Sequence, residues 1–130
     1  MVKKDILVIN KNSNIAVSTL WSKKELILNM LPEEVKKKIG IIGTTYTVYG
    51  INYILETLSN FPKIDTLIVF GADLSESGNA IVRIFREKDF GNYKIVFPKE
   101  KIKPILDTVR VIDLREEFKR RNYKALEEVI

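Results

Sequence analysis

The sequence predicts an α/β fold: a mainly parallel sheet of about six strands with helices on both faces, arranged as a Rossmann-like three-layer sandwich. Short runs of β-branched and apolar residues alternate along the chain with segments whose apolar residues recur at helical spacing. One continuously apolar run, residues 66–70, is typical of a strand buried inside a parallel sheet. The 130 residues contain no repeat, low-complexity tract or linker, so we expect a single domain over 1–130.

The first third of the chain predicts two strands and two short helices. Residues 6–9 predict a strand, and the polar residues 10–14 predict the turn after it. Residues 15–20 predict a second strand, which forms an edge hairpin with the first because the connection is too short for a crossover. Ser22 and Glu25 have the spacing of a capping box. The helix that follows has an apolar face of Leu26, Ile27, Met30 and Leu31, and a second helical piece is expected at residues 33–38.

The rest of the chain continues the alternation. Residues 39–43 predict a strand, and the next helix has one apolar face made of Ile51, Ile54, Leu55 and Leu58. After the strand at 66–70, a helix is expected with Ala80, Ile81, Ile84 and Phe85 on one side. Residues 94–97 and 109–114 predict the last two strands, with a helix at 99–107 between them. Asp113 and Glu116 have the spacing of a capping pair at the start of a terminal helix.

The composition excludes several classes of chemistry. Without Cys or His, the chain has no disulfide, no thiolate nucleophile and no Ser-His or Cys-His triad. The formal charge of +5 is split between two basic flanks and an acidic centre: residues 39–82 hold 1 basic and 4 acidic side chains. Because basic and acidic residues are interleaved elsewhere, we expect no nucleic-acid partner. The start of the chain shows no signal peptide, and no apolar run approaches the ~20 residues of a membrane span. A cytoplasmic protein is therefore expected.

Three polar loops follow predicted strands, at the sheet edge where ligands of parallel α/β folds bind. Glycines there let the backbone approach a ligand, and hydroxyls with helix N-terminal N–H groups can hold an anion. We expect a ligand site, with no metal and no assigned catalytic residue, made of Trp21, Gly43, Thr44, Thr45, Thr47, Gly71, Asp73, Ser75, Ser77 and Gly78. The alternative is that Thr44 or Thr47 only caps the next helix, and that Asp73, Ser75 and Ser77 are turn residues.

Three segments carry a resemblance: GTTYTVYGI at residues 43–51, NFPKI at 60–64 and LIVFG at 67–71. They resemble the corrinoid-binding A subunit of tetrahydromethanopterin S-methyltransferase. They are more similar to an uncharacterised archaeal domain attached to dihydropteroate-synthase-like proteins and found near thymidylate-synthase-like ones. The resemblance covers residues 14–114 and implies an α/β domain that holds a cobamide, with a His after the apolar strand as lower cobalt ligand. Residues 73–78 contain no His, so His-ligated cobalt chemistry is not expected.

Three hypotheses for the function follow. The first is a small-molecule-binding domain of pterin or corrinoid one-carbon metabolism, with a cobamide or a tetrahydropterin as ligand. The second is a non-enzymatic module that docks on a larger pterin or thymidylate enzyme through Phe118, Tyr123 and Leu126 of the last helix. The third is an enzyme with Asp73, Glu76 or Tyr46 as acid or base. Catalysis and homo-oligomerisation are left open, and the Ile- and Lys-rich composition is compatible with an archaeal, methanogen-like source.

Overall fold

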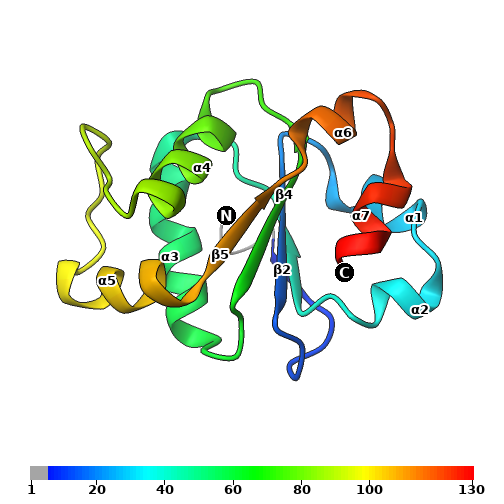
Figure 1. The fold of residues 1–130 in the computed structure, drawn as a ribbon, viewed down its shortest axis with the longest axis horizontal. Coiled ribbons are helices and arrows are strands. Elements are labelled where there is room, and N and C mark those ends of the chain that lie inside the picture. Colours follow the sequence, from blue (N-terminus) through cyan, green and yellow to red (C-terminus); the bar gives the residue numbers. More distant parts are fainter. Residues whose placement is uncertain (1–5) are drawn as a thin grey trace.

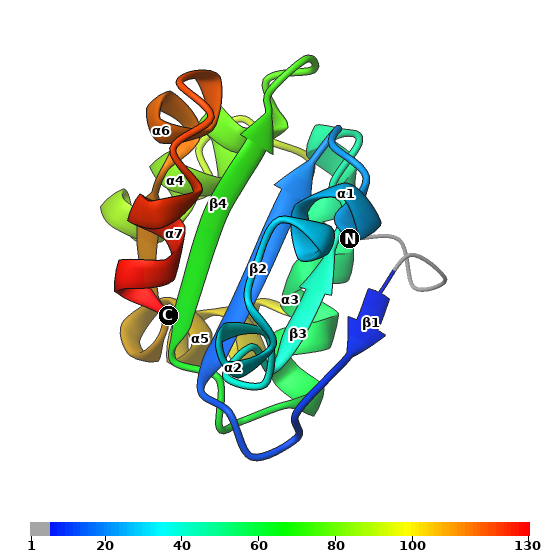
Figure 2. The same cartoon turned by 90° about the vertical axis from the view of Figure 1, so that its right-hand side faces the viewer.

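The computed structural model describes residues 6–130, which form an α/β fold with five strands and seven α-helices. The strands are β1 (Ile6–Val8), β2 (Ile15–Leu20), β3 (Ile41–Gly43), β4 (Thr66–Ala72) and β5 (Arg110–Asp113). They lie in the order β1-β3-β2-β4-β5, and every neighbouring pair is parallel except β1 with β3. The predicted mainly parallel sheet is confirmed, and the carboxyl ends of its parallel strands share one edge, uppermost in Figure 2.

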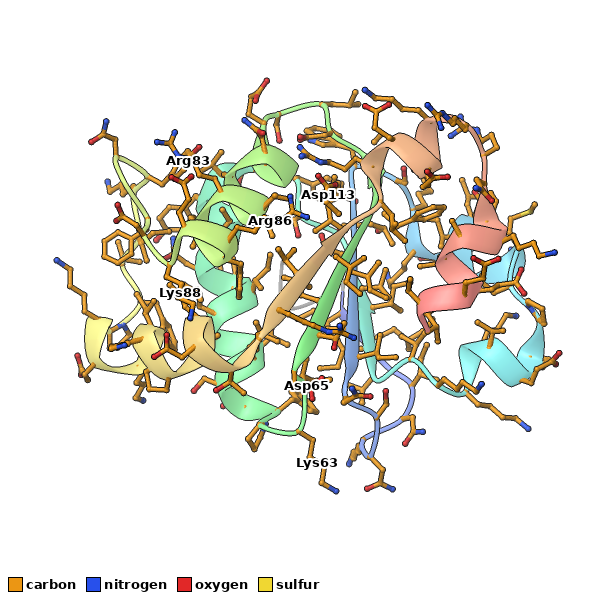
Figure 3. The ribbon with its side chains drawn as sticks, in the orientation of Figure 1. Lys63, Asp65, Arg83, Arg86, Lys88 and Asp113 are labelled. Atoms are coloured by element: carbon orange, nitrogen blue, oxygen red, sulfur yellow. The ribbon has the colours of Figure 1, made fainter. Side chains whose placement is uncertain are left out.

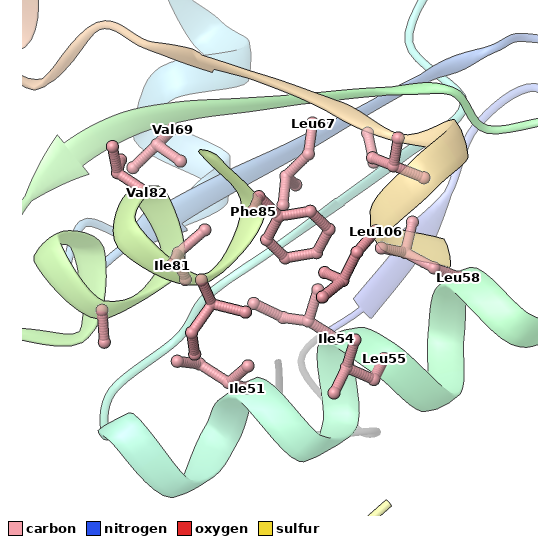
Figure 4. Close-up of a cluster of buried hydrophobic side chains, with 14 of the residues drawn as sticks. Ile51, Ile54, Leu55, Leu58, Leu67, Val69, Ile81, Val82, Phe85 and Leu106 are labelled. Carbon is pink, nitrogen blue, oxygen red and sulfur yellow. The ribbon is translucent and has the colours of Figure 1, made fainter. Parts of the chain in front are cut away.

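Helices cover both faces of the sheet (Figure 1). On one face lie α3 (Ile51–Asn60), which follows the short 3-10 turn η2 (Val48–Gly50), α4 (Ser77–Glu87) and α5 (Lys99–Thr108). The other face carries α1 (Lys24–Asn29), α2 (Glu33–Lys36), α6 (Arg115–Lys119) and α7 (Tyr123–Val129). Each face has its own hydrophobic core, one of which is drawn in Figure 4. No helix within residues 6–130 has the length and apolar character needed to cross a bilayer.

The predicted hairpin between the first two strands is wrong. β1 does lie at the sheet edge, but it pairs antiparallel with β3, with Leu7 opposite Ile42. β2 instead lies inside the sheet between β3 and β4. All six residues of β2 are buried, whereas Leu7 and Val8 of β1 are exposed. β2 has six residues against three in β1, so a central position for the longer strand removes more apolar surface from water than an edge position would.

The strand predicted at residues 94–97 is also wrong, and a buried side chain explains why. The Oδ1 atom of Asn52 on α3 accepts hydrogen bonds from the backbone N–H groups of Val96 (2.7 Å) and Phe97 (3.2 Å). Its Nδ2 atom donates to the carbonyl oxygens of Lys94 (3.2 Å) and Tyr49 (2.9 Å). These backbone groups therefore bond to a side chain instead of a neighbouring strand, and the described sheet has five strands, not six.

We expect Asn52→Ala to loosen the segment between α4 and α5 and to lower the free energy of unfolding by about 1–2 kcal/mol, because the substitution removes its hydrogen bonds. Urea unfolding and hydrogen exchange at the Val96 and Phe97 amides measure the effect. The matched control is Asn60→Ala, which alters an exposed residue at the end of the same helix. Equal protection of the two amides in both variants would contradict the assigned contact.

Two predicted helix starts differ in detail. The capping box at Ser22 and Glu25 does not form, because the Ser22 hydroxyl accepts a hydrogen bond from the Ala72 amide (3.1 Å) and α1 begins without a side-chain cap. Within that helix only part of the predicted apolar face is buried: Leu26 and Met30 are exposed.

The predicted terminal helix is two helices, α6 and α7. Asp113 Oδ1 does accept a hydrogen bond from the Arg115 amide at the start of α6 (3.2 Å).

Candidate functional site

The three polar loops predicted to form a site do meet at the carboxyl edge of the sheet. The Trp21 indole N–H, after β2, donates to the Ser75 hydroxyl after β4 (3.0 Å). Ser75 in turn donates to the carbonyl oxygen of Tyr46 after β3 (2.6 Å). The Ser77 hydroxyl donates to the carbonyl oxygen of Thr45 (2.9 Å). Residues 25 or more positions apart in the sequence are thus joined in one hydrogen-bonded cluster.

These contacts fill the crevice between the loops that follow β2 and β4. The chain leaves β2 toward α1 on one face and leaves β4 toward α4 on the other, which is where parallel α/β sheets open a ligand crevice. Here the Trp21 amide donates to the Ala72 carbonyl oxygen (3.1 Å), and the rings of Trp21 and Tyr46 meet edge to face at 5.0 Å. The polar groups of this crevice are therefore occupied with one another.

Two of the threonines that follow β3, Thr45 and Thr47, form hydrogen bonds within the protein. The Thr47 hydroxyl accepts a hydrogen bond from the Gly50 amide (3.2 Å), so the capping alternative is confirmed for this residue. The Thr45 hydroxyl lies 2.8 Å from that of Ser18, and both are buried. The Thr44 hydroxyl is buried and has no hydrogen-bond partner among the described residues. Gly43 ends β3, and Gly78 lies in the first turn of α4, both buried.

β2 and β4 come unusually close at Gly71. A Cβ atom built on this residue would lie 1.9 Å from the carbonyl oxygen of Thr19, far inside any real contact. The pairing of the two strands is irregular between Ser18 and Leu20. Leu20, although fully buried, has a φ of 52°, in the left-handed region that costs most residues energy. The sheet edge that carries the loops is thus shaped by the absence of a side chain at Gly71.

An open pocket of about 660 Å³ lies on the other side of the β4 loop, beyond the carboxyl ends of β4 and β5. Of the ten predicted site residues, only Gly71 and Asp73 line it. Its apolar lining includes Leu74 and Phe118. Charged side chains make up much of the rest, both acids (Asp73, Glu76, Asp113 and Glu116) and bases (Arg115, Lys119 and Arg121). The pocket therefore mixes hydrogen-bond donors and acceptors of both charges.

At one side of this pocket Arg115 bridges two aspartates. Its Nε and Nη2 atoms donate to the two carboxylate oxygens of Asp113 at 2.8 and 2.7 Å, and its Nη1 donates to Asp73 Oδ2 at 3.0 Å. Asp113 is the last residue of β5 (Figure 3). All three side chains are about four-fifths buried, with 16–20% of their surface exposed. Such a bidentate, partly buried pair fixes the plane of the guanidinium.

Asp113 and Arg115 each shift the pKa of the other so that the charged form is favoured. Burial raises the pKa of Asp113, but the hydrogen bonds from Arg115 and its charge outweigh burial and hold the pKa below the ordinary value. The hydrogen bonds and charge of Asp113 raise the pKa of Arg115 above its ordinary range, against the effect of burial. Both groups are therefore ionised throughout the physiological pH range.

Asp73 has a second set of partners at the start of α4. Its Oδ1 accepts from the Gly78 amide and its Oδ2 from the Asn79 amide, each at 3.0 Å. Together with Arg115, these donors occupy both oxygens, so Asp73 caps a helix and positions an arginine. Glu76, the other predicted acid of this loop, is exposed. The arrangement suits binding better than proton transfer by these carboxylates.

The docking surface predicted on the last helix is wrong. Phe118 and Leu126 are 9% and 0% exposed and belong to the core between the sheet and the helices α1, α6 and α7. Tyr123 is half-buried, and its ring lies 5.2 Å from that of Phe70 in β4. These side chains face the sheet because α6 and α7 cover it, so they do not form the exposed apolar patch that a docking partner needs.

Sequence reasoning missed the side of the pocket formed by Arg115, Lys119 and Arg121. One signal was present: Asp113 and Arg115 stand at the end of the last predicted strand, which is the same kind of position as the three loops considered.

A search of protein families and a search of curated proteins each find no match to this chain.

Proposed function

We propose that this chain is a small-molecule-binding α/β domain of pterin-linked one-carbon metabolism and that its site is the pocket between the β4 loop and α6. The observation that carries the proposal is the position of this pocket at the carboxyl edge of parallel strands, where such sheets bind ligands. Its volume of about 660 Å³ is in the usual range for small-molecule sites. Helices on both faces of a mostly parallel sheet support classification as a Rossmann-like three-layer sandwich.

A tetrahydropterin suits the pocket, and a cobamide does not. The chain has no His to ligate cobalt. The crevice between the loops after β2 and β4 is filled by Trp21 and its partners, so it offers no slot for part of a large cofactor. A pterin is a flat heterocycle whose edge displays both donors and acceptors, and it matches a lining that mixes carboxylates with Arg and Lys. The pterin class itself comes from the resemblance at residues 43–51, 60–64 and 67–71.

Calorimetric titration with a tetrahydropterin, a cobamide and ATP tests the proposal. We expect the tetrahydropterin alone to bind, and Asn79→Phe to weaken its binding about tenfold or more, because an exposed side chain at the pocket wall would be replaced by a bulky ring. The matched control is Asn92→Phe, the same change at an exposed residue that does not line this pocket. Absence of binding to the wild type, or equal binding by both variants, would refute the proposed site.

A further inference from the structure

We infer that the ligand of this pocket carries an oxyanionic group, a carboxylate or a phosphate, which binds to the free N–H groups of Arg115. The inference rests on the proposed function, since it concerns the same pocket, and it adds the chemistry that selects the ligand. Three features carry it: the unused donors of Arg115, the fixed orientation of its guanidinium, and the charges around it.

Arg115 has donors left over after its two aspartates are satisfied. A guanidinium has five N–H bonds. Asp113 takes one from Nε and one from Nη2, and Asp73 takes one from Nη1. Within residues 6–130, one N–H on each terminal nitrogen is therefore without an assigned acceptor. Two N–H bonds on neighbouring nitrogens have the spacing that binds two oxygens of one carboxylate or phosphate.

The two aspartates occupy different parts of the guanidinium. Asp113 takes its side along Nε and Nη2, and Asp73 takes one N–H of Nη1. Gly78 packs beside both groups, since a Cβ built on it would lie 2.9 Å from Asp73 Oδ2 and 3.0 Å from Arg115 Cδ. Because Arg115 lines the pocket and both aspartates hold its plane, its remaining N–H groups are oriented before a ligand arrives.

Two basic side chains add to the attraction for an anion, within a lining that holds four acids and three bases. The charge of Asp113 is paired with Arg115, and that of Asp73 is shared between Arg115 and the first turn of the 11-residue helix α4. At the mouth, Arg121 stacks on the Phe118 ring at 4.7 Å and has no acidic partner among the described residues. Lys119 forms only an exposed pair with Glu116, at 3.2 Å, which is weak in water. Arg121 and Lys119 can therefore add their charge to a bound oxyanion.

The first test uses the unmodified protein and inorganic phosphate. In a titration followed by NMR of the arginine Nε–H signals, at constant ionic strength with chloride, we expect the Arg115 signal to shift and saturate. The internal control is Arg83, whose Nε forms an exposed pair with Glu87. A parallel titration with succinate distinguishes a carboxylate site from a phosphate site by which probe saturates at lower concentration. Shifts at Arg115 no larger than those at Arg83 with both probes would overturn the inference.

The second test separates this inference from the proposed function. Arg115→Lys keeps the charge but removes the two remaining N–H groups of the terminal nitrogens, so phosphate and a carboxylate-bearing tetrahydropterin should each bind about tenfold more weakly. A tetrahydropterin without an acidic tail should lose little. Lys119→Ala, which removes a charge at the mouth, should have the smaller effect on all three. If both pterins bind equally well to wild type and Arg115→Lys, the inference fails and the proposed function stands. If only phosphate binds, the proposed function fails and the oxyanion site stands.

Discussion

Gly71→Ala is expected to leave the protein largely unfolded, with a loss of about 4 kcal/mol or more of stability. The new Cβ would lie 1.9 Å from the carbonyl oxygen and 2.5 Å from the carbonyl carbon of Thr19. Both atoms belong to the backbone of β2, which cannot move away from β4 without separating the two central strands of the sheet. Urea unfolding followed by far-UV circular dichroism measures the loss.

The control for this substitution is Gly91→Ala. Gly91 has a φ of 48°, and a Cβ there would meet no atom within 4 Å. The cost of the control is therefore conformational, about 1 kcal/mol, without a steric clash. If the two variants proved equally stable, the close approach of β2 and β4 at Gly71 would be contradicted.

The second large effect is expected from Asp113→Asn, with a loss of about 2–3 kcal/mol at neutral pH, because two charge-assisted hydrogen bonds depend on the carboxylate. The amide oxygen of Asn can accept from only one of the Arg115 nitrogens at 2.7 and 2.8 Å, and the amide N–H₂ then faces the other donor. Chemical denaturation at pH 7 measures the difference from wild type.

This loss should depend on pH in a defined direction. The pKa of Asp113 in the folded chain lies below its ordinary value of 3.8. A carboxyl group whose pKa is lowered by folding contributes stability above its unfolded pKa, and that contribution is lost as the pH falls through the folded pKa. The gap between wild type and Asp113→Asn should therefore be constant above about pH 5 and shrink below about pH 4.

Asp107→Asn is the matched control for the aspartate. Asp107 also has a lowered pKa, through hydrogen bonds and charge from Lys103 and Lys88, but the pair is exposed. Exposed ion pairs contribute little because water screens them. A loss on Asp107→Asn as large as that on Asp113→Asn would show that the partly buried bridge of Arg115 contributes nothing special to stability.

The elements predicted best from the sequence are those whose residue pattern alone decides burial. β4 could be predicted because a continuously apolar run suits a strand covered on both faces. The apolar faces of α3 and α4, including Ile54 and Ile84, are buried as their helical spacing predicts. In both cases the information is local, since it needs only the residues of the element itself.

Two of the wrong predictions, the strand at residues 94–97 and the capping box at Ser22, have a common physical cause: a group that a local pattern assigned to one partner hydrogen-bonds to a distant one. The backbone of residues 94–97 bonds to Asn52, 42 or more positions earlier in the chain. The Ser22 hydroxyl bonds to the Ala72 amide and not to the first turn of α1. Neither partner can be inferred from the segment whose structure it decides.

The open pocket lies at the sheet edge where the sequence predicts a site, but on the other side of the β4 loop from the predicted loops. Following glycines and hydroxyls led to the three loops that hydrogen-bond to one another. The pocket instead lies where Asp73 meets Arg115, two residues 42 positions apart in the sequence. Which of several polar loops stays open depends on side-chain contacts across the edge, and composition does not encode those contacts.

The carboxylate of Asp73 also has a mechanical consequence. It holds the first turn of α4, which packs on one face of the sheet, and it holds Arg115, the first residue of α6, which packs on the other. The sheet otherwise separates the two hydrophobic cores. Through this one side chain the two helix layers are joined directly around the end of the sheet, in addition to the strands that contribute residues to both cores.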